Sequence, residues 1–228
     1  VVAERYGVSR EDQDAFALRS QERAVAAIGA GHFAAEIVPI EPARAEAPFV
    51  RDEHPRAGTT LEALARLRPV FRDGGTVTAG NSAGINDGAA AVVLMCESEA
   101  ERRGLSPRLR LRAWAVSGID PEVMGYAPAL AIPKALERAG LTLADIDLVE
   151  LNEAFAAQAV AVVRDVGLDP EIVNVSGGAI ALGHPIGATG GILTVKLMHA
   201  LERVGGSRGI VTMCIGGGQG LAAVFETL

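Results

Sequence analysis

The sequence predicts an α/β fold in which helices and strands form packed layers. Segments of strand composition alternate along the chain with segments of helical periodicity, the element order of layered α/β proteins. The chain has 228 residues, of which 49% are hydrophobic, enough to bury a sizeable core. Glycine clusters separate several of the segments, as expected of tight turns. We therefore expect one large or two modest globular domains.

The first third of the chain predicts helices joined by irregular structure. Ser9 is a suitable N-cap for a helix whose apolar residues recur at helical spacing until Gly31. Thr59 and Glu62 have the spacing of a capping box, and Pro69 ends the helix that they begin. The expected elements are a helix over 10–30, a strand over 35–40, an irregular stretch over 42–58 and a helix over 61–67.

The rest of the chain predicts alternating strands and helices. Short apolar runs on either side of the glycine-rich turn 80–88 indicate buried strands. The Ala- and Val-rich segment 153–166 is apolar on most of its circumference, which predicts a buried helix. The other expected elements are strands over 76–79 and 89–95, a helix over 97–103, a strand over 109–116, a helix over 128–139, strands over 147–151 and 172–175, a helix over 188–204, and strands over 209–213 and 221–226.

Charge and composition argue against several classes of function. The net charge is −7, from 21 basic and 28 acidic residues, and no basic stripe suits a nucleic acid. No apolar run approaches the roughly 20 residues that cross a bilayer, and no signal peptide is recognisable. The two cysteines and four histidines form no disulfide framework and no metal-binding pattern. We expect a cytoplasmic protein with no metal, no membrane and no nucleic-acid partner.

His184 lies in the loop Gly183-His184-Pro185, among several other glycines. A single loop histidine is more often structural than catalytic. The local density of glycine, however, indicates that the backbone approaches a ligand closely or adopts a positive φ. Pro185 also biases His184 to an extended conformation. A rigid loop of this kind, opening onto a helix, suits the binding of a bulky acyl ligand.

Cys214 ends an apolar run and precedes three glycines, whereas Cys96 precedes a charged helix. A free cysteine is commonly a small buried hydrophobe. The glycine turn favours a functional role for Cys214, because its backbone N–H groups can face a developing negative charge. Asn152 follows a strand, where asparagine serves either as an N-cap or as an amide that holds a water or an oxyanion. The turn 80–88 matches no phosphate-binding fingerprint and is interpreted as structural.

Three motifs in the second half of the chain resemble signatures of the thiolase family, and further similarity covers nearly the whole sequence. The motifs are Asn152-Glu153-Ala154-Phe155, Gly183-His184-Pro185 and Cys214-Ile215-Gly216-Gly217-Gly218. The resemblance is to the acetyl-CoA acetyltransferase and 3-ketoacyl-CoA thiolase branch. It implies a five-layer αβαβα architecture, with residues 1–85 as the loop domain for covering the site and for oligomerisation. Residues 86–107 would return to the N-terminal half, and 108–228 would form the C-terminal half.

The resemblance also implies roles for individual residues. His184 would activate a cysteine nucleophile and, with Asn152, surround the thioester oxygen. Cys214 would be the general acid/base, and the N–H of Gly216 would belong to a second oxyanion site. The reaction would be Claisen condensation of acetyl-CoA or CoA-dependent thiolysis of 3-ketoacyl-CoA, with CoA and acyl-CoA as substrates and no permanently bound cofactor. The positions that match CoA contacts of the family are Arg56, Phe71, Ala79, Ser82 and Phe155.

The sequence also departs from the family pattern. Ala83 stands where the family's pantetheine-contacting serine is expected. Neither Cys96 nor Cys214 lies in the motif of the acyl-accepting nucleophile. We therefore expect a C-terminal part that lacks the N-terminal nucleophile half, with that half as a partner in a homo-oligomer, a dimer or a tetramer. The alternative is a non-catalytic thiolase-like subunit that binds acyl-CoA or serves as a scaffold.

Overall fold

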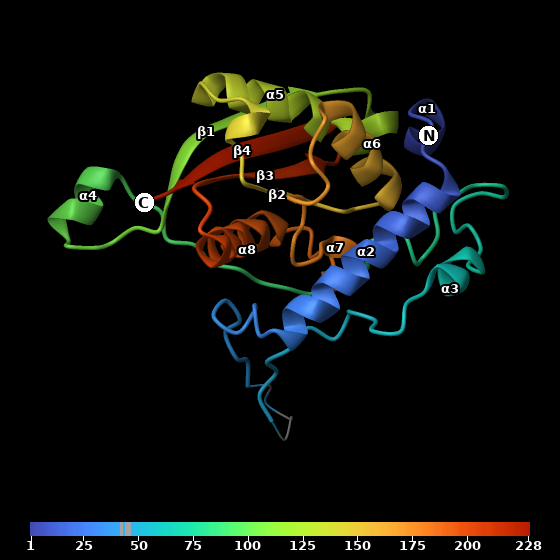
Figure 1. Ribbon diagram of the computed structural model, residues 1–228, viewed down its shortest axis with the longest axis horizontal. Helices are drawn as coiled ribbons and strands as arrows, with labels where there is room; N and C mark the ends of the chain where they lie inside the picture. Colours follow the sequence, from blue (N-terminus) through green and yellow to red (C-terminus); the bar gives the residue numbers. More distant parts are fainter. Residues whose placement is uncertain (42, 44–46) are drawn as a thin grey trace.

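The computed structural model describes residues 1–41, 43 and 47–228. Its centre is a four-stranded sheet in the order β1-β4-β3-β2 (Figure 1). The β1–β4 and β4–β3 pairs are antiparallel, and the β3–β2 pair is parallel. The strands are β1 (Leu109–Gly118), β2 (Leu148–Leu151), β3 (Arg208–Ile215) and β4 (Gln219–Thr227).

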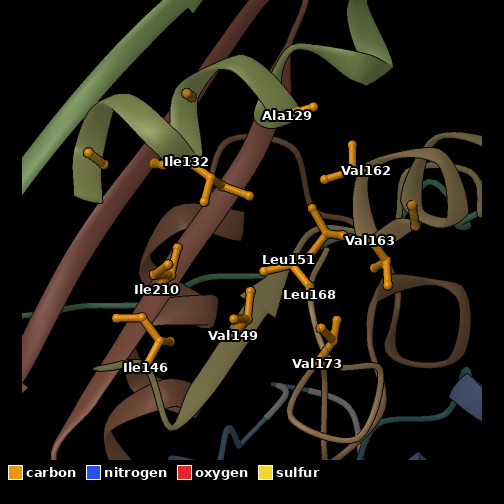
Figure 2. Packing of buried hydrophobic residues seen from close by; sticks show 14 of the residues in the cluster. Ala129, Ile132, Ile146, Val149, Leu151, Val162, Val163, Leu168, Val173 and Ile210 are labelled. Carbon is orange, nitrogen blue, oxygen red and sulfur yellow. The ribbon is translucent and has the colours of Figure 1, made fainter. Parts of the chain in front are cut away.

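Helices cover both faces of this sheet, with α5 (Pro128–Ala139) and α6 (Ala156–Val166) on one face and α8 (Thr189–Val204) on the other (Figure 1). Because side chains of a strand alternate between faces, Ile210 of β3 packs toward α5 and α6 while Val211 packs toward α8. Figure 2 shows the larger cluster, in which Ile132 of α5 and Val149 of β2 lie beside Ile210. This layered arrangement confirms the α/β prediction.

The first third of the chain lies against the helical layers rather than in the sheet. The helix α2 (Arg10–Gly29) begins at the N-cap Ser9, as predicted, and Asp12 completes the capping box. It packs against α6 and the short α7 (Ala179–Leu182). The other short helices are α1 (Val2–Arg5), α3 (Leu61–Ala65), α4 (Glu97–Arg102) and the 3₁₀ turns η1 (Pro121–Tyr126) and η2 (Leu143–Asp145).

Four of the predicted strands do not form. Segments 35–40, 76–79 and 172–175 each contribute only an isolated bridge, through Ile40, Thr78 and Val173. Segment 89–95 has no strand partner among the described residues, and Val93 is 86% exposed. A strand needs a neighbour for its backbone N–H and C=O groups, so an apolar pattern alone does not produce one.

Helix starts also differ from prediction. Thr60, not Thr59, caps α3, because its hydroxyl accepts from the Ala63 N–H at 3.2 Å. The helix predicted from Glu153 begins at Ala156, after a loop that carries Asn152. Asn152 is therefore not an N-cap.

Part of the predicted irregular stretch 42–58 lies outside the described residues. Within the described ranges, no helix is both long and apolar enough to span a membrane.

A buried ion pair joins α8 to β2. Lys196 Nζ lies 2.9 Å from Glu150 Oε2 and donates to the Gly177 carbonyl oxygen at 2.6 Å. Glu36 lies near this pair, and its buried Oε2 accepts no hydrogen bond from any described residue. Burial raises the pKa of Glu36 from 4.5 to about 7, against the opposing attraction of Lys196. Between pH 4.5 and about 7, the folded state therefore holds a proton on Glu36 that the unfolded chain releases.

We predict that Glu36→Gln stabilises the protein above pH 7 and leaves its stability near pH 4 unchanged. Because the folded-state pKa is raised, the native carboxyl loses stability as pH rises from 4.5 to about 7. The gain should be about 1 to 2 kcal/mol after allowance for solvent screening. Chemical denaturation at the two pH values measures it. Glu53→Gln, at an exposed position, is the control, and an equal gain at both pH values would contradict the assignment.

Candidate active site

Asn152 lies at the end of β2, where the chain leaves the sheet. Its N–H donates to the Thr212 carbonyl oxygen at 2.9 Å, which extends the pairing with β3 by one residue. The side chain is buried, and its Nδ2 lies 3.3 Å from Nε2 of His184. Its Oδ1 has no hydrogen-bond partner among the described residues. The fold thus brings together two of the residues that the sequence singled out, although they are 32 positions apart.

The hydrogen bonds around His184 determine which ring nitrogen carries the proton. Nδ1 lies 2.8 Å from the hydroxyl oxygen of Thr189, and that hydroxyl donates its proton to the Pro185 carbonyl oxygen at 3.0 Å. The Thr189 oxygen must therefore accept from Nδ1–H, so that Nε2 keeps its lone pair. Burial lowers the pKa of His184, which keeps the imidazole neutral at pH 7. A neutral ring with a free Nε2 can act as a base.

Glu153, the residue after Asn152, ties three segments together. Its buried carboxylate accepts from Ser20 Oγ at 2.6 Å, from Asn174 Nδ2 at 2.7 Å and from the Ile180 N–H at 3.2 Å. Ser20 lies on α2 and Ile180 on α7, which leads directly to His184. Burial raises the pKa of Glu153, and these hydrogen bonds oppose that rise. The network fixes the Asn152 loop and the His184 loop relative to each other.

Cys214 lies on β3, next to the hairpin turn that joins β3 to β4. It lines a cavity of about 460 Å³ together with Phe71, Met124 and Phe155. This volume is within the range of small-molecule sites. Burial raises the pKa of the Cys214 thiol, so the thiol is protonated at neutral pH. In this state Cys214 can donate a proton to a carbanion or a thiolate.

The turn after Cys214 is built from three glycines. The strand register ends at Ile215 and Gln219, so that Gly216, which is exposed, lies outside the ladder. Gly218 has φ +88°, and a Cβ at this position would come within 2.1 Å of the Ile119 carbonyl oxygen. Only glycine fits such a close approach in this conformation. The turn is thereby fixed against the segment that precedes η1.

The five positions expected to contact CoA do not all lie together. Phe71 and Phe155 form an edge-to-face pair with ring centroids 6.0 Å apart, and both line the cavity. Ser82 forms an isolated bridge with Phe155, while its hydroxyl donates to the Thr78 carbonyl oxygen at 2.7 Å. Arg56 and Ala79 are exposed and are not among the described residues that line the cavity.

Comparison with known families decides the family of the chain. The model of the thiolase C-terminal domain matches residues 105–227, and the model of the thiolase N-terminal domain matches residues 1–98. The chain belongs to the thiolase family. It is 54% identical to an acetyl-CoA acetyltransferase of Rhizobium meliloti and 54% identical to a 3-ketoacyl-CoA thiolase of Bacillus subtilis. The first alignment covers 100% of this chain and 58% of the relative, and the second covers 99% and 60%.

Solved structures give the same result. The acetyl-CoA acetyltransferase of Bacillus anthracis superposes with a TM-score of 0.96 at 50% identity. Human mitochondrial 3-ketoacyl-CoA thiolase in complex with CoA superposes with a TM-score of 0.92 at 45% identity. These alignments cover 100% of this chain but only 58% and 57% of the two solved chains. The chain thus has a thiolase-like α/β fold and spans less than two thirds of the length of these relatives.

The match over residues 1–98 corrects one prediction. We expected a C-terminal part that lacks the N-terminal half and needs that half as a partner. That interpretation is wrong, because the chain itself contains a match to the N-terminal domain. The prediction relied on the absence of one nucleophile motif. A domain is defined by its whole pattern of residues, however, and one missing motif does not remove it.

Two further residues of the site were not predicted from the sequence. Thr189 determines the tautomer of His184, and Glu153 holds the two loops in register. Thr189 lies at the start of α8, only five positions after His184. This short spacing could have suggested a contact between the two side chains. The partners of Glu153 come from residues 20, 174 and 180, and no local pattern connects them.

We predict that Glu153→Ala lowers the free energy of unfolding by about 3 to 5 kcal/mol, because it leaves three buried donors without an acceptor. Equilibrium denaturation measures the change. Glu22→Ala is the matched control, since Glu22 is exposed on the same helix as Ser20, and it should change stability by less than about 0.5 kcal/mol. Equal effects of the two substitutions would show that the carboxylate does not tie the segments together.

Proposed function

We propose that the protein to which this chain belongs is a thiolase-type acyltransferase. The observation that carries the proposal is the contact between Asn152 Nδ2 and His184 Nε2 at 3.3 Å, within a chain of the thiolase family. The substrates would be CoA thioesters, either acetyl-CoA for condensation or a 3-ketoacyl-CoA for thiolysis. CoA is a substrate here and not a resident cofactor.

In thiolysis, a cysteine thiolate attacks the 3-keto carbon, and the bond between C2 and C3 breaks. The leaving acetyl-CoA enolate takes a proton, which the protonated Cys214 can supply. A CoA thiol then gives its proton to the Cys214 thiolate and displaces the acyl group from the enzyme cysteine, which releases the shortened acyl-CoA. We propose that His184 takes the proton of the enzyme cysteine at Nε2 and returns it once the acyl group has left. Nε2–H and Asn152 Nδ2–H can then donate together to a thioester oxygen.

We expect the acyl-accepting thiol to come from the part of the relatives' length that this chain does not span, because neither Cys96 nor Cys214 fits that role. Cys96 is exposed at the N-cap of α4. Gly216 would contribute its N–H to a second oxyanion site. Phe71 and Phe155 would flank the pantetheine arm, with Ser82 supporting Phe155, while Arg56 and Ala79 are proposed as outer contacts to CoA.

We also propose the organisation that the resemblance implies. The five-layer αβαβα architecture belongs to the whole protein, with residues 1–85 as the loop domain, 86–107 as the returning segment and 108–228 as the C-terminal domain. A homo-oligomer and a cytoplasmic location complete the proposal. The acidic net charge of −7 is consistent with the absence of nucleic acid from the proposed partners.

We predict that the protein, as its gene encodes it, cleaves acetoacetyl-CoA in the presence of CoA. His184→Gln should lower kcat by about 100- to 10,000-fold, the usual contribution of a general base. His32→Gln is the matched control, because His32 lies in the turn after α2, away from the Asn152–His184 contact. Full activity of His184→Gln would contradict the role of His184. Tight CoA binding with no turnover would instead support a non-catalytic subunit.

A further inference from the structure

His184 is held by its backbone as well as by its ring. Its N–H lies 3.2 Å from Asn86 Oδ1 and 3.3 Å from the Gly84 carbonyl oxygen. Because a backbone N–H only donates, the side-chain atom of Asn86 that faces it must be the amide oxygen. Both acceptors belong to one short segment, more than ninety positions away in the sequence.

The amide of Asn86 also packs against Gly183. This glycine has φ +96°, and a Cβ there would lie 2.5 Å from Cγ and Oδ1 of Asn86. His54 supports the same segment from another side, since its Nδ1 lies 2.9 Å from the Ala181 carbonyl oxygen and its ring lies against Gly84. The half-buried side chain of Asn86 therefore contacts both Gly183 and His184.

We propose that Asn86 is a positioning residue for His184, an inference that rests on the proposed catalytic role of His184. The imidazole has a contact on each nitrogen, with Thr189 and with Asn152. Asn86 adds a third contact, to the backbone N–H of His184, which fixes the position from which the imidazole side chain extends. The Nε2–Asn152 contact of 3.3 Å is already long for a hydrogen bond. A small shift of the backbone is enough to break it.

The test compares three variants of the protein as its gene encodes it. Asn86→Leu keeps the approximate size of the side chain but removes the acceptor. Asn86→Asp restores an acceptor and adds a negative charge beside His184. Asp87→Asn changes the charge at the neighbouring exposed position and serves as the control. The readouts are kcat and KM for thiolysis, the pH profile, and the titration of His184 by NMR of isotope-labelled histidine.

We expect Asn86→Leu to lower kcat about 10- to 100-fold with little change in KM, because the base is displaced while the substrate site remains. Asn86→Asp should recover most of kcat and shift both the His184 titration and the pH profile to higher pH, since the carboxylate favours the imidazolium. Asp87→Asn should leave the His184 titration and the pH profile unchanged. The ¹⁵N shifts of Asn86→Leu should show a mixture of tautomers at His184.

Two results would overturn the proposal. One is an Asn86→Leu variant with wild-type kcat and an unchanged His184 titration. The other is an Asn86→Asp variant whose His184 titrates as in the wild type, which decides the matter even where the Leu variant does not fold. If the wild type has no thiolysis activity, the proposed function fails. The NMR titration still tests the contact between Asn86 and His184 in that case.

Discussion

The carboxylate of Glu153 is the constraint on which the site depends. A buried carboxyl group is tolerated only where donors replace its lost hydration, and here three donors do so. Ser20 Oγ, which donates to Glu153, also accepts from the Gly178 N–H at 3.1 Å. The Glu153 side chain thus connects α2, the loop after β2 and the start of α7. The residues on either side of these contacts have little freedom to move.

Because that network is rigid, the polar groups of the site are oriented before any ligand arrives. Asn152 follows directly from β2, and His184 follows α7 after Gly183. The orphan Oδ1 of Asn152 is buried and the His184 imidazole is half-buried, so fixed dipoles act on them more strongly than in water. Cys214 approaches from the β3–β4 hairpin and opens onto the cavity with Phe71 and Phe155. Base and acid are therefore supplied by separate elements of the fold.

Part of this arrangement could be predicted from the sequence. The helix 128–139 and the strand 109–116 follow local periodicity, since their apolar residues repeat with the period of the element. His184, Asn152 and Cys214 stand out because polar side chains occur in glycine- and alanine-rich motifs. Segment 89–95 has an apolar strand pattern but no partner among the described residues, and local pattern carries no information about partners.

Residues that act through distant contacts could not be found in this way. Asn86 and Thr189 reach His184 from separate segments, and their side chains are unremarkable in sequence. The prediction that the N-terminal half is missing failed for a different reason, because a single motif was given more weight than the pattern of the whole domain.

The proposed function depends on carbanion chemistry at a thioester, with Cys214 as the acid/base. The most direct measurement is exchange of deuterium from D₂O into the methyl group of acetyl-CoA, catalysed by the protein as its gene encodes it. This step breaks only a C–H bond and isolates Cys214 from the acyl-transfer steps. We predict exchange in the wild type and its loss in Cys214→Ala, with exchange retained in Cys96→Ala. Exchange at the wild-type rate in Cys214→Ala, or none in the wild type, would contradict it.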